Sequence, residues 1–324
     1  MTTPVALTRA RSRPSHQPLR HAAAWCYLFV LPGLALAVLF TFWPLAAAWY
    51  YSFQEWSGFT KDMDFVGLAN YVRLIMDAQF WNAFAHSFLF MIVTVPVRLV
   101  LALVLAIVLN DRLFRMATFF RTVFFLPVVT TTAIVGLVMT FVLDPSSGPV
   151  NHVLLALGVV DAPVGFLTDP HLAMPTVMAT SVWKFFGISL VYWLAALQSI
   201  PAELYEAARI DGASGLRMHL TITAPLLKVY AVVIVVITAA NTLRIFDLVQ
   251  TMTGGGPYFA TEVIEVYIYR TAFSVLGGGV PQLGLASAAG VFFGVTVMII
   301  ALLQVGATRR LAGLRNAVGA GQGR

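Results

Sequence analysis

Charged residues are scarce in this chain of 324 residues, at 10% of the sequence against about 25% in an average soluble domain. Hydrophobic residues make up 59%. This composition predicts a protein that lies in a lipid bilayer. The net charge of +6 does not indicate nucleic-acid binding, because membrane proteins collect Lys and Arg in their cytoplasmic loops and no basic patch lies beside an aromatic surface that could read bases.

Residues that carry chemistry are also few. The single cysteine, Cys26, excludes an intrachain disulfide and a Cys-based metal site. The six histidines show no metal-ligand spacing such as H-E-x-x-H, and no Gly-x-Ser-x-Gly turn is present. No G-x-x-x-x-G-K-[S/T] phosphate loop occurs either. The sequence therefore predicts a chain that is no enzyme, with no catalytic residue, no metal site and no cofactor of its own.

Long apolar runs are what the sequence does contain. Each is long enough to cross a bilayer as a helix, which takes about 20 residues. The first run exceeds the 7 to 15 apolar residues of a signal peptide, so we expect it to be retained as a span. The sequence predicts an all-α, polytopic membrane protein with six spans, at 24–50, 85–109, 117–143, 172–197, 229–250 and 285–307.

The distribution of basic residues predicts the orientation of these spans. Thirteen Lys and Arg residues lie in the two tails and in the connections on the same side, whereas three lie on the opposite side. Because basic residues are retained in the cytoplasm, both tails are expected there. The expected organisation is a cytoplasmic tail at 1–23, a transmembrane domain at 24–308 and a second cytoplasmic tail at 309–324, in a cell membrane.

One polar stretch of about thirty residues, 198–228, is built to fold between two spans. Pro201 suits a helix start, and Glu203 and Glu206 complement the positive end of the helix dipole. Asp211-Gly212 then ends the helix, since Gly212 can adopt the left-handed conformation of a C-cap. A second short helix is expected to follow. The charge distribution places this helix-turn-helix in the cytoplasm.

Polar residues within the spans are candidates for a solute pathway. Lys184 lies about twelve residues into its span, or about 18 Å deep, beside Ser181, Trp183 and Phe185. Aromatic rings with a few hydrogen-bonding groups suit a sugar, although aromatic residues in membrane helices often serve packing alone. Arg121 lies near a span end and is expected to extend to the interface, whereas Arg98 has no evident local partner.

A second candidate group recurs at every third residue of the fifth span: Asn241, Arg244 and Asp247. On one continuous helix these residues share a face. Two interpretations stay open, in which Arg244 and Asp247 neutralise each other or the face lines the pathway. Three glycines and Pro257 follow and must end the helix, which fits the external mouth of a cavity. Residues 65–81 are expected to form a short external amphipathic helix.

The polar stretch closely resembles the cytoplasmic "EAA" loop of permease subunits of binding-protein-dependent ABC importers. The resemblance rests on Glu206-Ala-Ala-Arg-Ile-Asp-Gly-Ala-Ser214, followed by Ile222 and Pro225. Flanking segments resemble carbohydrate permeases of the maltose and glycerol-phosphate type, namely 196–205, 246–257, Thr261-Glu262 and 269–273. The resemblance extends over nearly all of 25–304, with a core permease domain at about 84–304.

This resemblance implies a type I ABC importer permease fold in a prokaryotic cytoplasmic membrane. It also implies four kinds of partner: a second homologous permease, two ATPase subunits that bind ATP and Mg, an external binding protein and a carbohydrate. The coupling positions carried over are Glu206, Ala207, Ala208, Asp211, Gly212 and Ala213. Two residues depart from the family pattern: His219 replaces a usual bulky apolar residue, and Val229 replaces a frequent proline.

Two other classes of function fit the composition alone. A self-sufficient secondary transporter or channel would take up a small solute without an ATPase. A membrane scaffold or receptor would bind partners without moving a solute. Copurification with a nucleotide-binding subunit would distinguish the importer from both alternatives, because the importer alone requires that subunit.

Overall fold

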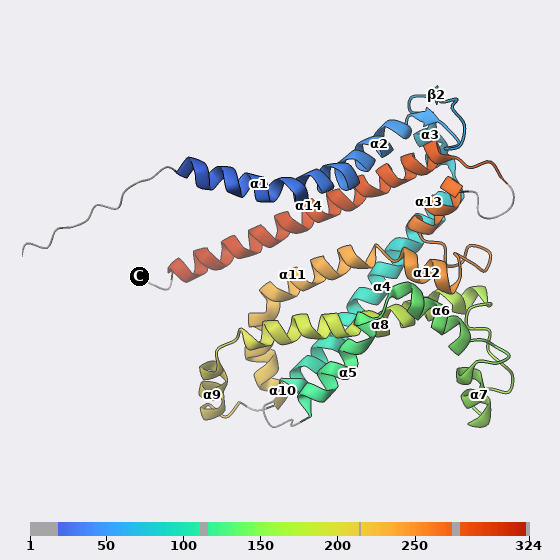
Figure 1. Cartoon of the computed structure of the whole chain (residues 1–324). Coiled ribbons are helices and arrows are strands. Elements are labelled where there is room, and N and C mark those ends of the chain that lie inside the picture. The colour runs from blue at the N-terminus through green and yellow to red at the C-terminus, as the bar shows by residue number, and fades with distance from the viewer. Residues whose placement is uncertain (1–18, 111–115, 214, 274–278, 322–324) are drawn as a thin grey trace, which may run out of the picture. The chain divides into compact units, whose positions relative to one another are not determined.

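The computed structural model describes residues 19–110, 116–213, 215–273 and 279–321, and most of them are helical (Figure 1). The chain divides into two compact units, one ending at Tyr50 and the other beginning at Tyr51. Helix α1 (Leu19–Ala37), the π-helical turn η1 (Val38–Phe42) and α2 (Trp43–Tyr51) form an unbroken helical run, all of which except Tyr51 belongs to the first unit. Residues 27–51 are long and apolar enough to cross a membrane, as predicted for the first span.

The second unit begins with a two-stranded antiparallel sheet, β1 (Gln54–Glu55) and β2 (Asp64–Phe65), followed by α3 (Ala69–Met76). The single helix expected at 65–81 is therefore wrong in its bounds. Asp77 leaves the helical region with φ −82° and ψ 106°, and its carboxylate accepts a hydrogen bond from the Gln79 N–H. This cap separates α3 from the span that follows.

Four further single helices of this unit are long and apolar enough to cross a membrane, one of them at His219–Thr242. They include α4 (Ala78–Leu109), α8 (Pro170–Gln198) and the membrane-crossing part of α14 (Leu283–Gly321). Helices α4 and α8 pack against each other along their lengths and provide much of the buried apolar core (Figure 1). Helix α14 continues through residues 309–321, which the sequence analysis assigned to a tail.

The third predicted span, 117–143, is two helices rather than one. Helix α5 (Ala117–Val129) and α6 (Thr132–Val142) meet at an angle of 97°. Thr130 and Thr131 between them have ψ values of 141° and 134°, outside the helical range. Helix α5 packs on α8, where a Cβ at Gly187 would lie 2.2 Å from the Phe124 carbonyl oxygen, so only glycine permits this approach. Helix α6 packs on α12.

The fifth predicted span, 229–250, is also interrupted. Helix α11 (Ala224–Thr242) ends before Leu243, and α12 (Phe246–Met252) starts as a separate helix. The Phe246 N–H, which has no partner within α12, donates to the Glu265 carboxylate at 2.7 Å. Glu265 belongs to α13 (Ile264–Phe273), and α7 (Pro149–Ala156) lies in the connection after α6. Counting the bent α5–α6 pair as one, the described residues contain up to six spans, as predicted.

Candidate functional site

The predicted coupling segment forms α9 (Ala202–Ile210), a turn, and then α10 (Gly215–Met218). Gly212 has φ +79°, the left-handed conformation expected of it. The Ala213 N–H donates to the Ala208 carbonyl at 2.8 Å, and this bond closes the end of α9. The second helix is not a separate short one, because α10 continues through the π-helical η2 (His219–Thr223) directly into α11. The segment is therefore joined to the fifth span without interruption.

The outer face of α9 and its turn is exposed. Glu206, Ala207, Asp211 and Gly212 are exposed, whereas Ala208 is buried and Ala213 is half-buried. Ile210 is 87% exposed, and the sequence predicted no role for it. Its position inside the EAA-like stretch is the signal that could have identified it. Single exposed apolar residues are common on protein surfaces, so the exposure of Ile210 does not by itself define an interface.

Two side chains fasten α9 to the span beside it. The Tyr205 hydroxyl and the Thr223 hydroxyl share a hydrogen bond of 3.0 Å, and His219 Nδ1 lies 3.2 Å from the same hydroxyl. His219, which departs from the family pattern, thus faces its own helix. His219 is half-buried where the segment joins α11, and it does not belong to the exposed outer face of α9.

Lys184 lies at the break between α5 and α6. Its Nζ donates to the carbonyl oxygens of Pro127 at 2.9 Å and Thr130 at 2.7 Å. These carbonyls stand at the end of α5, where the helix offers them no partner, so the ammonium replaces the missing donors. The side chain is 1% exposed. In this structure the buried Lys184 ammonium holds the end of α5 at the bend.

The other polar groups predicted near Lys184 divide between two faces of α8. The Phe185 ring lies between two cations, 5.2 Å from Lys184 Nζ and 5.8 Å from the Arg98 guanidinium carbon. Arg98 is buried and donates to the Thr242 hydroxyl of α11 at 3.0 Å, which is the partner the sequence did not reveal. Ser181 is also buried. Arg121 donates to the Leu109 carbonyl at the end of α4.

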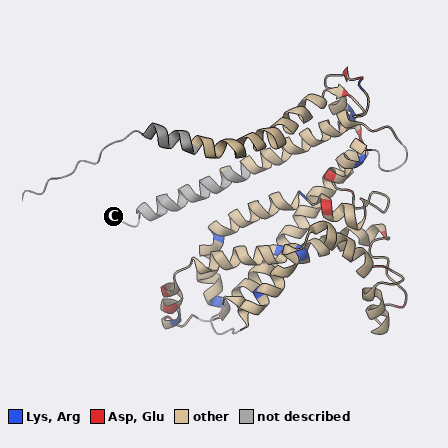
Figure 2. Cartoon of the chain, in the orientation of Figure 1, with Lys and Arg blue, Asp and Glu red and all other residues tan. Residues whose placement is uncertain are grey.

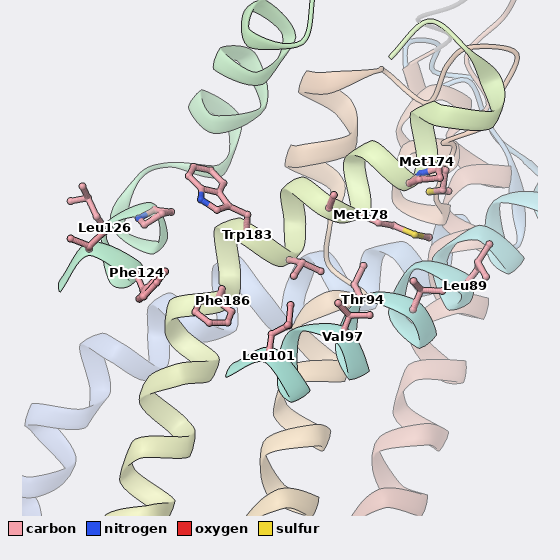
Figure 3. Close-up of a pocket in the computed structure, with 16 residues that line it drawn as sticks. Leu89, Thr94, Val97, Leu101, Phe124, Leu126, Met174, Met178, Trp183 and Phe186 are labelled. Atoms are coloured by element: carbon pink, nitrogen blue, oxygen red, sulfur yellow. The ribbon is translucent and has the colours of Figure 1, made fainter. Parts of the chain in front are cut away.

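Trp183 lies on the opposite face of α8, in an apolar groove between α4, α5 and α8 (Figure 3). The groove has a volume of about 1040 Å³ and is bordered by Phe186 of α8, whose ring contacts that of Phe124 at 5.4 Å. Thr94 is the one hydroxyl that lines it, and this hydroxyl donates to the Phe90 carbonyl. The lining suits hydrocarbon rather than a sugar, which needs several hydrogen-bonding partners.

The expectation that Asn241, Arg244 and Asp247 share one helix face is wrong. Leu243, Arg244 and Ile245 are not helical, and all three polar residues are exposed. Within the described ranges the ion pairs are Arg73 with Glu55 and Arg270 with Glu262, so of the two open interpretations the mutual neutralisation of Arg244 and Asp247 by an ion pair is not observed. These residues stand instead at an interruption between α11 and α12, where an exposed cation is presented beside irregular backbone.

A buried ion pair closes the connection between α12 and α13. Glu262 is 1% exposed, and its carboxylate accepts from Arg270 Nε at 2.7 Å. Burial raises the pKa of the Glu262 carboxyl above its ordinary value, an effect that Arg270 opposes. Tyr267 donates to the Asp77 carboxylate, so α13 is also tied to the cap of α4. Figure 2 shows that such charged groups are separated by long stretches of helix without any charge.

Comparison with known proteins identifies the family to which this chain belongs. The family described as "Binding-protein-dependent transport system inner membrane component" matches residues 78–313. The chain belongs to this family.

Curated relatives extend the match beyond that domain. The permease is 35% identical to the probable ABC transporter permease YurN of Bacillus subtilis, over 86% of this chain and 94% of the relative. It is 33% identical to the lactose transport permease LacF of Rhizobium radiobacter, over 87% and 93% of the two chains. It is 34% identical to the sn-glycerol-3-phosphate permease UgpA of Agrobacterium fabrum, over 86% and 92%.

Solved structures show the same fold. A chain of a bacterial ABC transporter for the acidic polysaccharide alginate superimposes with a TM-score of 0.77 at 26% identity, over 90% of the permease and 96% of that chain. A second structure, in complex with an alginate pentasaccharide-bound periplasmic protein, gives the same TM-score over 92% and 98%. The type I ABC importer permease fold and the role of a transport subunit predicted from the sequence are thereby confirmed.

Proposed function

We propose that this permease forms half of the translocation pathway of an ATP-driven importer for a sugar or sugar derivative. The partners proposed are a second homologous permease, two ATPase subunits and an external binding protein. The relatives named for lactose and sn-glycerol 3-phosphate, and the alginate transporter, support the carbohydrate class. The distribution of basic residues supports a cytoplasmic position for both tails and for α9.

The observation that carries the coupling role is the exposed face of α9 and its turn. Glu206, Ala207, Asp211 and Gly212 are presented to solvent with Ile210, on a segment that continues directly into α11. Small side chains permit close approach of another subunit, and ATP hydrolysis requires such a subunit because this chain has no phosphate loop. Docking of an ATPase on α9 would therefore act on the fifth span.

Purification of the tagged permease from the cells that produce it tests this proposal. We expect a nucleotide-binding subunit and a second permease to copurify, and the reconstituted assembly to take up a labelled sugar only with ATP inside. Uptake by the single chain in liposomes, driven by an ion gradient, would instead support a secondary transporter. Partner binding without any solute flux would support a scaffold or receptor.

For the solute we propose a pathway that passes the interruption between α11 and α12. The candidate residues remain those predicted from the sequence, and they are proposed to act in different ways. They are Ser181, Trp183, Lys184, Phe185, Asn241, Arg244 and Asp247. Arg244 is exposed at the interruption and is proposed to contact the solute. Lys184 and Phe185 are proposed to position the neighbouring helices, since Lys184 bonds the α5–α6 break and Phe185 lies against Arg98.

Substitution of Arg244 by alanine tests the pathway. A hydrogen bond from a charged donor contributes about 1.5 to 3 kcal/mol, which corresponds to roughly tenfold to hundredfold in affinity. We expect Arg244→Ala to raise the concentration of sugar-loaded binding protein that half-maximally stimulates the ATPase of the assembly by about tenfold. Arg73→Ala, an exposed arginine on α3, is the control. Equal stimulation of the Arg244→Ala and Arg73→Ala assemblies would remove Arg244 from the pathway.

A further inference from the structure

The loop between α12 and α13 is held together by its own hydrogen bonds. The Thr261 hydroxyl donates to the Gly256 carbonyl at 2.7 Å and shares a second bond of 2.7 Å with the Thr253 hydroxyl. The Thr261 N–H donates to the Gly255 carbonyl at 3.2 Å. Thr261 is fully buried and Glu262, which follows it, is bonded to Arg270. The loop is therefore a fixed structure and presents its tip in one conformation.

The tip carries two aromatic residues in a backbone conformation that they rarely adopt. Tyr258 has φ +49° and Phe259 has φ +62°. Such a conformation costs about 1 to 3 kcal/mol for each non-glycine residue and persists where the surroundings enforce it. Tyr258 is 90% exposed, so packing within the chain does not offset this cost. The Phe259 ring is held by the Arg270 guanidinium, 5.0 Å from the ring centroid.

A row of polar side chains on α4 faces the same hollow as these rings. Gln79, Asn82 and His86 are spaced by three and four residues, so they share one face of a helix that is otherwise strongly apolar. Together with Tyr258 and Phe259 they line a hollow of about 520 Å³. The row is anchored to the loop, because His86 Nδ1 lies 3.1 Å from the Glu262 carbonyl oxygen. His86 thus helps to hold the loop, whereas the exposed Asn82 amide is presented at the hollow.

We infer that this hollow is a binding subsite for a neutral pyranose ring, separate from the Arg244 region. An aromatic ring presents the apolar surface on which the C–H face of a sugar packs, and amide and imidazole groups bond its hydroxyls. Among the described residues that line the hollow none is Asp, Glu, Lys or Arg, so a phosphate or carboxylate would find no fixed counterion there. The inference rests on the proposed function, because a sugar must reach this loop before it enters the membrane.

The tyrosine at the tip provides a direct probe. The assembled transporter, purified without binding protein in lipid nanodiscs, is labelled with 3-fluorotyrosine at position 258 through a reassigned codon. Lactose, a neutral sugar of two pyranose rings, is then titrated against the fluorine NMR signal. We expect a saturable shift with lactose and none with sn-glycerol 3-phosphate at equal concentration. No shift with lactose, or an equal shift with both compounds, would overturn the inference.

Two variants and a titration with the binding protein serve as controls for this experiment. Asn82→Ala removes an exposed amide from the hollow and is expected to weaken the lactose response about threefold to tenfold, the effect of one or two neutral hydrogen bonds. Phe65→Ala removes a 75% exposed ring on β2 and is expected to leave it unchanged. A shift caused by binding protein alone, with none from lactose, would show a protein-docking loop instead. Intact ATP-driven uptake with no lactose response would overturn the subsite but not the importer.

Discussion

Replacing Arg270 by methionine is expected to destabilise the permease by about 3 to 5 kcal/mol at neutral pH, because the buried Glu262 carboxylate loses its counterion. The two side chains are 20% and 2% exposed, so water compensates little of the loss. Thermal unfolding of the purified protein in detergent measures the effect. Arg73→Met is the matched control, since the Arg73–Glu55 pair is about half exposed and such pairs contribute about 0 to 1 kcal/mol.

The pH dependence of the Arg270→Met variant identifies the cause. Burial already raises the pKa of Glu262, and loss of the arginine removes the charge that opposes this shift. A carboxyl group with a raised pKa in the folded state contributes stability below its unfolded pKa and loses it as the pH rises through the folded pKa. We expect the deficit to shrink as the pH falls. A deficit that stays constant with pH, or that the Glu262→Met/Arg270→Met double variant does not reduce, would contradict the buried-charge explanation.

Replacing Gly212 by valine is expected to abolish sugar uptake while the permease still inserts in the membrane. Gly212 has φ +79°, which a β-branched residue adopts only at a cost of about 1 to 2 kcal/mol or more. A Cβ at this position would meet no atom within 4 Å, so the cost comes from the backbone conformation and not from a steric clash. The turn must change conformation to relieve this cost. The coupling face of α9 would then be misdirected. Uptake normalised to the amount of permease in the membrane measures the effect.

Two substitutions separate coupling from general strain. Gly212→Asn is expected to retain most uptake, since asparagine tolerates the left-handed conformation. Gly158→Val places the same residue at a glycine with φ +64° and open space around its Cβ, after α7 and far along the chain from α9. This variant is expected to transport sugar. Wild-type uptake by Gly212→Val at a normal membrane level would argue against a coupling role for the turn.

The spans and the conformation of the turn at Gly212 were predictable because they depend on local properties. Apolar length determines where a helix can cross a bilayer, and only glycine adopts the conformation of residue 212 without cost. The bend in the third span was missed because Thr130 and Thr131 do not interrupt an apolar run, and a proline such as Pro127 is tolerated within membrane helices. The angle is set by a tertiary partner, Lys184.

The candidate site was less predictable, because its partners come from distant parts of the sequence. Lys184 bonds backbone carbonyls 54 and 57 residues away, and carbonyls leave no signature in a sequence. The face proposed for Asn241, Arg244 and Asp247 assumed a continuous helix, but Leu243–Ile245 interrupt it without a glycine or proline. The hollow beside Tyr258 likewise requires a loop and a helix that are about 170 residues apart to be brought together, as tertiary folding does.

The unbroken helix from Gly215 to Thr242 has a mechanical consequence for the proposed importer. Its 28 residues span about 42 Å at the rise of an α-helix. A tilt of about 5 degrees around the α9 end would displace the other end by about 4 Å over this length. That end adjoins Arg244 and the interruption before α12, so in the proposed importer a small rotation at an ATPase interface would suffice to move this interruption by about the length of a hydrogen bond.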